Sequence, residues 1–227
     1  MMRAKPMLWG AAVAITLSST AALANVVVVK SLGPSAKAYP PGKTLPANAT
    51  ITLQGGDVVT VLGPNAAKTL RGPGNFDASQ VSLASAAAQR GRFSALRATE
   101  VAHNPSIWDI DVTQSGKVCV ADASKLQLWR PDSSGAASVE IHSADGASQK
   151  LSWAAGKAVA AWPSALPLKS GGQYQIEWSE TGDKSSVDVV TVNGVPADLV
   201  GTAKVLIENG CQNQLDLLVA GASKVSQ

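Results

Sequence analysis

The chain has 227 residues, of which 19 are lysine or arginine and 16 are aspartate or glutamate. Two of the basic residues lie in a predicted leader, so the rest of the chain is close to neutral and offers no basic surface for nucleic acid. About 200 residues beyond the leader suffice for one large domain or two small ones with hydrophobic cores.

Residues 1–24 have the features of a secretory signal peptide. Two basic residues precede an apolar run over 7–17, and an A-x-A cleavage site ends at Ala24. The apolar run is shorter than the ~20 residues of a membrane-spanning helix, which disfavours the alternative of a retained anchor. We expect a periplasmic protein that contacts the membrane only through the uncleaved signal.

Residues 25–76 alternate β-type runs with turns. A run of four valines begins at Val26, and further strands are predicted at 49–53, 58–62 and 67–70. Short strands punctuated in this way favour a small β-roll or barrel, closed by a turn over 72–75. Gly56-Asp57 is interpreted as a hairpin turn in which the aspartate binds its own backbone, and not as a ligand site.

The series aYppGktL…itLqgGDvvtvLgp…tLrGPG is similar to the periplasmic FecR-type domain, a glycine-rich β-roll. The resemblance covers Val26 to Phe76, about a quarter of the chain. The matching positions are Gly42, Leu45, Ile51, Leu53, Gly56, Asp57, Val59 and Leu62. It implies a FecR-like β-roll in an envelope sensory or regulatory setting.

Residues 77–102 are alanine-rich and lack proline, and Asp77 or Ser79 as N-cap predicts a helical linker. The one basic cluster beyond the leader follows and comprises Arg90, Arg92 and Arg97. Such a run is either a solvated linker or a contact for an acidic partner or a polyanionic glycan. Its position between two β units makes it a candidate partner contact.

Residues 103–195 carry stronger β signals. Alternation from Ile107 predicts a β-hairpin whose turn is 114–116 and whose return strand is 117–120. Further strands are predicted at 138–142, 149–153, 158–162, 173–178 and 186–192. About seven short strands in about 90 residues favour a two-layer sandwich.

The phrase LPLKSGGQYQIEW, residues 166–178, resembles the penultimate-strand motif of immunoglobulin-like and fibronectin-like domains. In those domains a loop marked by proline and glycine precedes a strand with an inward tyrosine, which here is Tyr174. The resemblance implies an Ig-like β-sandwich and carries no activity with it.

Residues 196–227 change to a helical pattern, with a first helix that ends at Asn209-Gly210 and a second over 212–219. We expect these helices to cover one end or edge of the sandwich, which prevents association between strand edges. The sequence therefore predicts a mainly β fold: a FecR-like β-roll, a helical linker, an Ig-like sandwich and short C-terminal helices.

Cys119 and Cys211 are the only two cysteines, and in an oxidising compartment an even pair is usually a disulfide. The bridge would close a loop of about 90 residues, which a chain-entropy estimate values at roughly 4–5 kcal/mol. Two free buried thiols or a catalytic thiol are the alternatives. We predict the Cys119–Cys211 disulfide, tying the C-terminal segment to the sandwich.

No G-x-S-x-G, H-E-x-x-H or P-loop sequence occurs. His142 shares a strand face with Glu140 but has no third ligand nearby, so no metal site and no cofactor are predicted. Asp109 and Asp111 also share a face. We interpret them as an acidic solvent face, with paired catalytic carboxylates as the alternative.

Five of the six tryptophans lie in residues 103–195, where they either fill the core or form a platform for a glycan or a protein. Strand parity places Trp108 in the core with Ile110 and Val112. Trp162, before Pro163 at a strand end, is expected to be the most exposed and is a candidate partner contact.

The chain is therefore expected to be a non-catalytic periplasmic binding or scaffold protein, an accessory of an envelope sensory or regulatory complex. Its partner is predicted to be another envelope protein. The alternatives are glycan binding through exposed tryptophans and a glycan hydrolase that uses Asp109 and Asp111, or Glu140.

Overall fold

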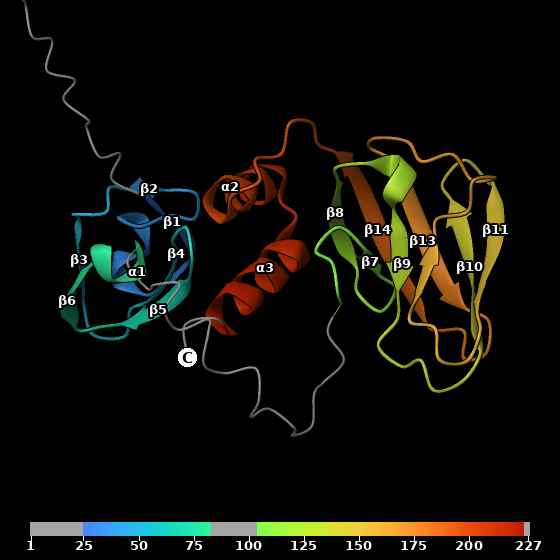
Figure 1. Cartoon of the computed structure of the whole chain (residues 1–227), viewed down its shortest axis with the longest axis horizontal. Helices are drawn as coiled ribbons and strands as arrows, with labels where there is room; N and C mark the ends of the chain where they lie inside the picture. The colour runs from blue at the N-terminus through green and yellow to red at the C-terminus, as the bar shows by residue number, and fades with distance from the viewer. Residues whose placement is uncertain (1–24, 83–103, 225–227) are drawn as a thin grey trace, which may run out of the picture.

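The computed structural model describes residues 25–82 and 104–224. The predicted signal peptide and most of the predicted linker, with its three arginines, lie outside the described residues. The described fold is mainly β, as the sequence predicted. Figure 1 shows three parts side by side: an N-terminal β unit, a pair of helices and a β-sandwich.

The N-terminal β unit, residues 25–82, is built from two antiparallel sheets. Its strands are β1 (Val26–Leu32), β2 (Thr44–Leu45), β3 (Thr50–Leu53), β4 (Val58–Leu62), β5 (Ala67–Arg71) and β6 (Gly74–Asp77). One sheet has the order β2-β1-β4-β5, and the other pairs β3 with β6. A single turn of helix, α1 (Ser79–Ser82), follows β6. All four predicted strands are present.

The stretch from Gly72 to Asn75 was predicted as a closing turn, but strand β6 begins within it at Gly74. The strand forms because its backbone finds an antiparallel partner in β3, with Ile51 opposite Phe76. The Thr52 hydroxyl also donates a hydrogen bond to the Asn75 side chain, at 2.8 Å. Pairing with a distant segment thus overrides the local turn signal of glycine and proline.

Asp57 confirms the structural interpretation of the Gly56-Asp57 turn. Its buried carboxylate accepts hydrogen bonds from the backbone N–H groups of Gln54, three residues earlier, and of Ser35, at 2.9 Å for Ser35. Burial raises the pKa of this carboxyl, but the bonds from Ser35 and Gln54 outweigh it and lower the pKa below its ordinary value. Gly33, at φ +101°, passes so close to Asp57 that no side chain fits there.

The β-sandwich consists of a five-stranded and a three-stranded sheet. Its strands are β7 (Ile110–Asp111), β8 (Gly116–Val120), β9 (Gln127–Trp129), β10 (Ala137–Ser143), β11 (Ser148–Trp153), β12 (Val159–Ala161), β13 (Gln173–Trp178) and β14 (Lys184–Thr191). The sheet orders are β11-β10-β13-β14-β8 and β12-β9-β7. Buried side chains from both sheets, such as Leu128 and Ile141, share one hydrophobic cluster, so the predicted two-layer packing is confirmed.

The predicted hairpin from Ile107 to Val120 is wrong. β7 pairs in parallel with β9, and β8 pairs in parallel with β14 in the other sheet. The segment between β7 and β8 is therefore a corner from one sheet to the other. Val112 secures it, since its N–H donates to the Trp129 carbonyl at 3.0 Å and its carbonyl accepts from the Ser185 hydroxyl at 2.8 Å.

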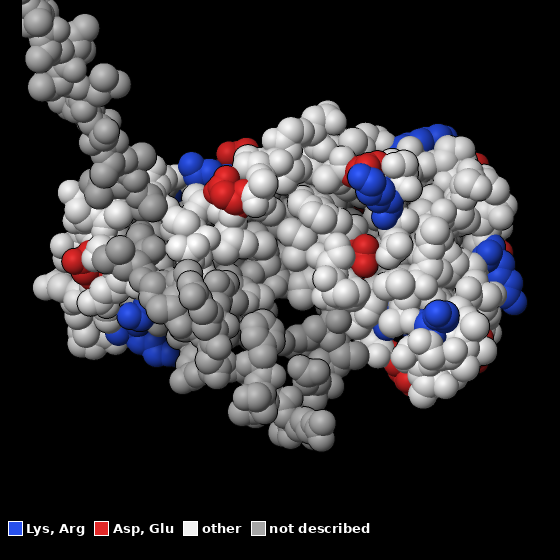
Figure 2. Space-filling view, in the orientation of Figure 1, with Lys and Arg blue, Asp and Glu red and all other residues white. Residues whose placement is uncertain are grey.

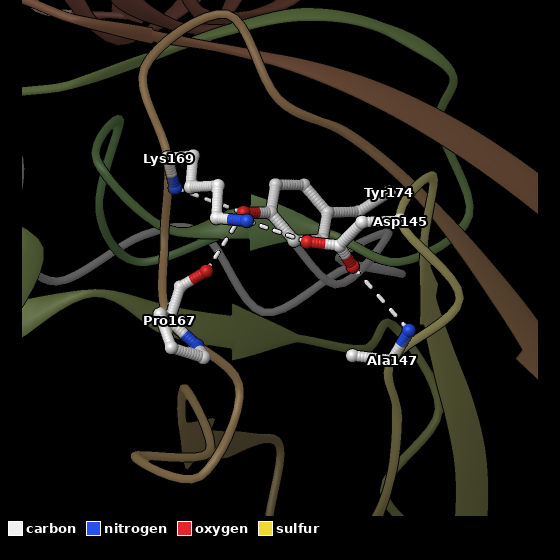
Figure 3. Close-up of polar contacts among 5 residues, drawn as sticks. All are labelled: Asp145, Ala147, Pro167, Lys169 and Tyr174. Carbon is white, nitrogen blue, oxygen red and sulfur yellow. Dashed lines mark hydrogen bonds and ion pairs between the residues drawn. The ribbon is translucent and has the colours of Figure 1, made fainter.

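Tyr174 on β13 is the inward tyrosine that the sequence predicted, and it is buried. Its hydroxyl donates to the Pro167 carbonyl at 2.9 Å and accepts from the Lys169 N–H at 2.8 Å, as Figure 3 shows. An inward tyrosine bound to the backbone of the preceding loop is also a feature of immunoglobulin-like sandwiches. The Ig-like assignment itself stays a prediction.

The loop before β13 is also tied to the β10–β11 turn. The Lys169 ammonium contacts the Asp145 carboxylate, which also accepts from the Ala147 N–H (Figure 3). The hydrogen bond from Lys169 and then that from Ala147 lower the pKa of Asp145 to about 2. Because both side chains are exposed, this pair contributes little to stability.

Two C-terminal helices follow the sandwich: α2 (Leu199–Asn209) and α3 (Gln212–Lys224). The Asp198 side chain caps α2 by accepting from the Gly201 N–H at 2.8 Å, and Gly210 ends it with the left-handed φ of +73°. The second helix extends beyond the predicted end at Val219. No helix among the described residues is long and apolar enough to cross a membrane.

The helix pair lies between the two β parts and contacts both (Figure 1). One hydrophobic cluster joins residues of all three parts: Val27, Val29, Leu62 and Ala67 of the N-terminal unit, Cys119 and Val192 of the sandwich, and Ala203, Leu206, Cys211, Leu215, Leu218 and Ala222 of the helical segment. We call this the joint cluster. Apolar burial therefore holds the two β units to the same pair of helices.

The Cys119–Cys211 disulfide lies within the joint cluster, as predicted, with the two Cα atoms 5.8 Å apart. It attaches the start of α3 to β8, the edge strand of the five-stranded sheet. Gln214, one turn further along α3, binds the same strand. Its amide accepts from the Cys119 N–H at 2.6 Å and donates to the Cys119 carbonyl at 2.8 Å. A side chain thus occupies two backbone groups that a further strand would use, and α3 covers this edge of the sandwich as predicted.

Candidate functional site

A cleft of about 240 Å³ opens where the sandwich meets α3. Its walls come from the segment before β7, from β7, β8, β9 and the following turns, and from α3. The lining residues are Asn104, Ile107, Asp109, Asp111, Gln114, Val118, Trp129, Asn213, Gln214 and Leu217. It combines two carboxylates and four side-chain amides with an apolar wall, so several groups able to bind a polar ligand converge on it.

Asp109 is the unusual group in this cleft. Only 9% of the residue is exposed, and no hydrogen bond or ion pair reaches its carboxylate from the described part of the chain. Burial raises the pKa of the Asp109 carboxyl above its ordinary value. A carboxyl group in a cleft whose pKa is raised by burial, and which no other described residue binds, marks a functional-site candidate.

The predicted solvent face that Asp109 was to share with Asp111 does not exist. β7 begins only at Ile110, and the Asn104 side chain binds the Asp109 carbonyl at 3.1 Å, which folds the preceding segment back. Alternation along an extended strand therefore does not apply to Asp109. The predicted environment of Asp109 on a solvent-exposed strand face is therefore wrong, although the sequence pattern singled out the residue.

Asp111 lines the same cleft but is bound within its own turn. One carboxylate oxygen accepts from the Thr113 N–H at 2.9 Å and from the Thr113 hydroxyl at 2.6 Å, and the other accepts from the Gln114 amide at 3.0 Å. These bonds stabilise the corner between the two sheets. The two carboxylates thus differ: Asp111 stabilises the backbone of its turn, whereas within residues 25–82 and 104–224 no group binds the Asp109 carboxylate.

Gln214 and Asn213 form the helical wall of the cleft, and the sequence analysis missed both. Gln214 also donates to the Ile107 carbonyl at 2.7 Å, and Asn213 donates to the Ser115 carbonyl at 3.0 Å. A usable signal was present: Gln214 lies three residues after Cys211, so the two share a helix face toward the sandwich.

The tryptophans do not form an exposed platform, because each of the five is at least half-buried. Trp153 stacks on Trp178 with ring centroids 6.1 Å apart. Trp108, predicted for the sandwich core, is half-buried and packs against the joint cluster instead. It precedes β7, so the alternation of inward and outward side chains along that strand does not extend to it.

Trp162, predicted to be the most exposed tryptophan, is half-buried. Its indole N–H donates to the Leu166 carbonyl at 2.7 Å, and its ring meets that of Tyr174 edge-on at 5.1 Å. These contacts hold Trp162 within the sandwich. Its contact with a partner stays a prediction, as does that of Arg90, Arg92 and Arg97, which lie outside the described residues.

His142 lies beside Glu140, as its strand position predicted, and also beside Glu177 of the neighbouring strand β13, which was not predicted. Its Nε2 lies 4.0 Å from the Glu140 carboxylate and 3.9 Å from that of Glu177, on the outer face of the five-stranded sheet. Lys184 also contacts Glu177, at 3.0 Å. Over residues 25–82 and 104–224, no group of three His, Cys, Asp or Glu residues has the arrangement of a metal site.

Charged side chains of both signs are present on the face of the molecule drawn in Figure 2. On the face drawn in Figure 2, lysine and arginine side chains lie in small separate groups and form no continuous basic patch. This face therefore presents no extended surface of one sign, of the kind that attracts nucleic acid. Short-range contacts in the cleft are therefore the better candidate for recognition.

Replacing Asp109 by Asn should raise the melting temperature at pH 7. Because the folded pKa of Asp109 is raised, stability is lost as pH rises from the ordinary aspartate pKa through the folded one. D109N removes that loss, so the gain should be full at pH 7 and vanish near about pH 3. Calorimetry over this pH range measures it.

The matched control is Asp111→Asn, two residues further on. It weakens the bonds from Thr113 and Gln114 and should lower the free energy of unfolding by about 0.5–1.5 kcal/mol. The same chemical change therefore has opposite signs at the two positions. A D109N protein that melts below the wild type at pH 7 would show that the carboxylate has a stabilising role instead.

Comparison with known proteins adds no assignment: no family model, no curated protein and no solved structure matches this chain.

Proposed function

We propose that this chain is a non-catalytic, exported binding or scaffold protein, an accessory of an envelope sensory or regulatory complex. The observation that carries the proposal is the joint cluster, in which one helix pair contacts both β units and a disulfide fastens it to the sandwich. Such a core holds two β surfaces in a fixed relation, which suits a protein that bridges or positions others. The predicted leader and the disulfide support a periplasmic location.

The cleft supports binding more than catalysis. General acid–base chemistry on a glycan uses two carboxylates with separate roles. Asp111 already accepts three hydrogen bonds within its own turn, whereas no other described residue binds the Asp109 carboxylate. An unpaired carboxylate can hold a cation without any second group.

A glycan hydrolase is the second candidate function. The observation in its favour is that Asp109, Asp111 and Trp129 line one cleft and that burial raises the pKa of Asp109, as a general acid requires. The other alternative, glycan binding through exposed tryptophans, has less support because each of them is at least half-buried.

Chemical crosslinking in envelope extracts tests the proposed function. The oxidised wild-type protein should capture the same envelope protein repeatedly, and replacing Arg90, Arg92 and Arg97 together by alanine should reduce that capture. The matched control replaces three exposed lysines, Lys37, Lys150 and Lys157. Release of sugar fragments from envelope glycan by the pure protein, abolished in D109N, would contradict the proposal in favour of the hydrolase.

A further inference from the structure

The described residues that line the cleft beside α3 carry negative charge and include no compensating cation. Two of its lining residues, Asp109 and Asp111, are carboxylates, and none of the ten is lysine or arginine. Asp109 is 9% exposed as a residue, and no hydrogen bond or ion pair from another described residue reaches its carboxylate. A carboxylate in this state gains most from a ligand that brings a positive charge and N–H donors into the cleft.

The other walls suit the remainder of such a ligand. Trp129, which is buried, Ile107, Val118 and Leu217 supply apolar surface for an aliphatic stem, and an aromatic ring attracts a nearby cation. The cleft, about 240 Å³, lies below the usual range of about 300–1,000 Å³ for small-molecule pockets. It is therefore sized for one long side chain and not for a chain of sugars.

We propose that the cleft receives a lysine or arginine side chain of the protein partner, with the cationic group bound to Asp109 and the stem against Trp129 and Leu217. This inference rests on the proposed function, because it gives the binding protein a defined contact. Gln214 and Asn213 hold the wall rigid through their bonds to the backbone, so the site exists before the partner arrives.

Titration with n-butylammonium, which has the charge and stem of a lysine side chain, tests the cleft directly. In ¹H–¹⁵N NMR spectra at constant ionic strength, the side-chain amide signals of Asn213 and Gln214 should shift and saturate. D109N should weaken binding at least about tenfold, which corresponds to about 1.4 kcal/mol. The matched control is Glu208→Gln, which removes one exposed carboxylate from α2 outside the cleft.

Two results would overturn the cation site: D109N binding as tightly as the wild type, or the uncharged analogue 1-butanol shifting the same signals equally. The partner assignment is tested separately, by repeating the crosslinking experiment with butylammonium at saturating concentration. Butylammonium should reduce capture of the envelope protein. Capture that persists unchanged, in D109N as well, would overturn the inference and leave the proposed function intact. Probe binding without any captured envelope protein would contradict both the proposed function and the partner assignment.

Discussion

Replacing Cys119 and Cys211 together by alanine should lower the free energy of unfolding by about 4–5 kcal/mol. The bridge joins residues 92 positions apart, so its loss releases a large loop in the unfolded chain. Both sulfurs are buried within the joint cluster, where alanine keeps the site apolar. Urea unfolding followed by tryptophan fluorescence measures the change, because the five tryptophans of the described chain lie in residues 104–192.

The control for this prediction is the wild-type protein unfolded in the presence of a thiol reductant, which should match the double variant. A loss of less than about 1 kcal/mol in both samples would mean that the helix pair holds to β8 without the bridge. The disulfide would then form because the compartment is oxidising, but it would add little to the stability of the contact between the helix pair and the sandwich.

Replacing Gln214 by alanine should lower the free energy of unfolding by about 2–4 kcal/mol. The change removes the partner of the Cys119 N–H and carbonyl and of the Ile107 carbonyl, in a place where the residue is 5% exposed. Leaving a buried backbone N–H or carbonyl group without a partner costs more stability than removing a hydrogen bond between exposed groups. Chemical denaturation at neutral pH measures the effect.

Gln212→Ala, two residues earlier on the same helix, is the matched control. The Gln212 amide is exposed and donates to the Asp216 side chain, so its removal should change stability by less than about 0.5 kcal/mol. Equal effects of the two substitutions would show that loss of helix propensity, and not the bond to the edge strand, explains Q214A.

The sequence predicted the elements whose signals are local. The alternation in 173–178 gave strand β13 with its observed bounds, and Ser143 to Gly146 gave the turn between β10 and β11. Gly210 ended helix α2 because it adopts the left-handed conformation that glycine favours. The disulfide was predicted because the predicted signal peptide indicates export to an oxidising compartment, where an even pair of cysteines is usually bridged. Each of these depends on neighbours in the chain or on composition.

The sequence did not predict which segments distant along the chain contact one another in the fold. The hairpin prediction failed because β8 pairs with β14, about 70 residues later, and local alternation does not state which strand lies beside another. The cleft also depends on a contact between distant residues, because the Gln214 side chain binds the Ile107 carbonyl 107 positions earlier in the sequence. Asp109 was recognised as one of a pair of acidic residues, but its burial follows from this long-range contact.

The central claim is that the helix pair and its joint cluster make the two β units one cooperative body. Native-state hydrogen exchange of the oxidised protein at increasing urea concentrations tests this most directly. Amides of β1 and β4 in the N-terminal unit should exchange with the same free energy and urea dependence as those of β10 and β13 in the sandwich. A separate opening of β1 and β4 at lower free energy, with β10 and β13 still protected, would contradict the claim.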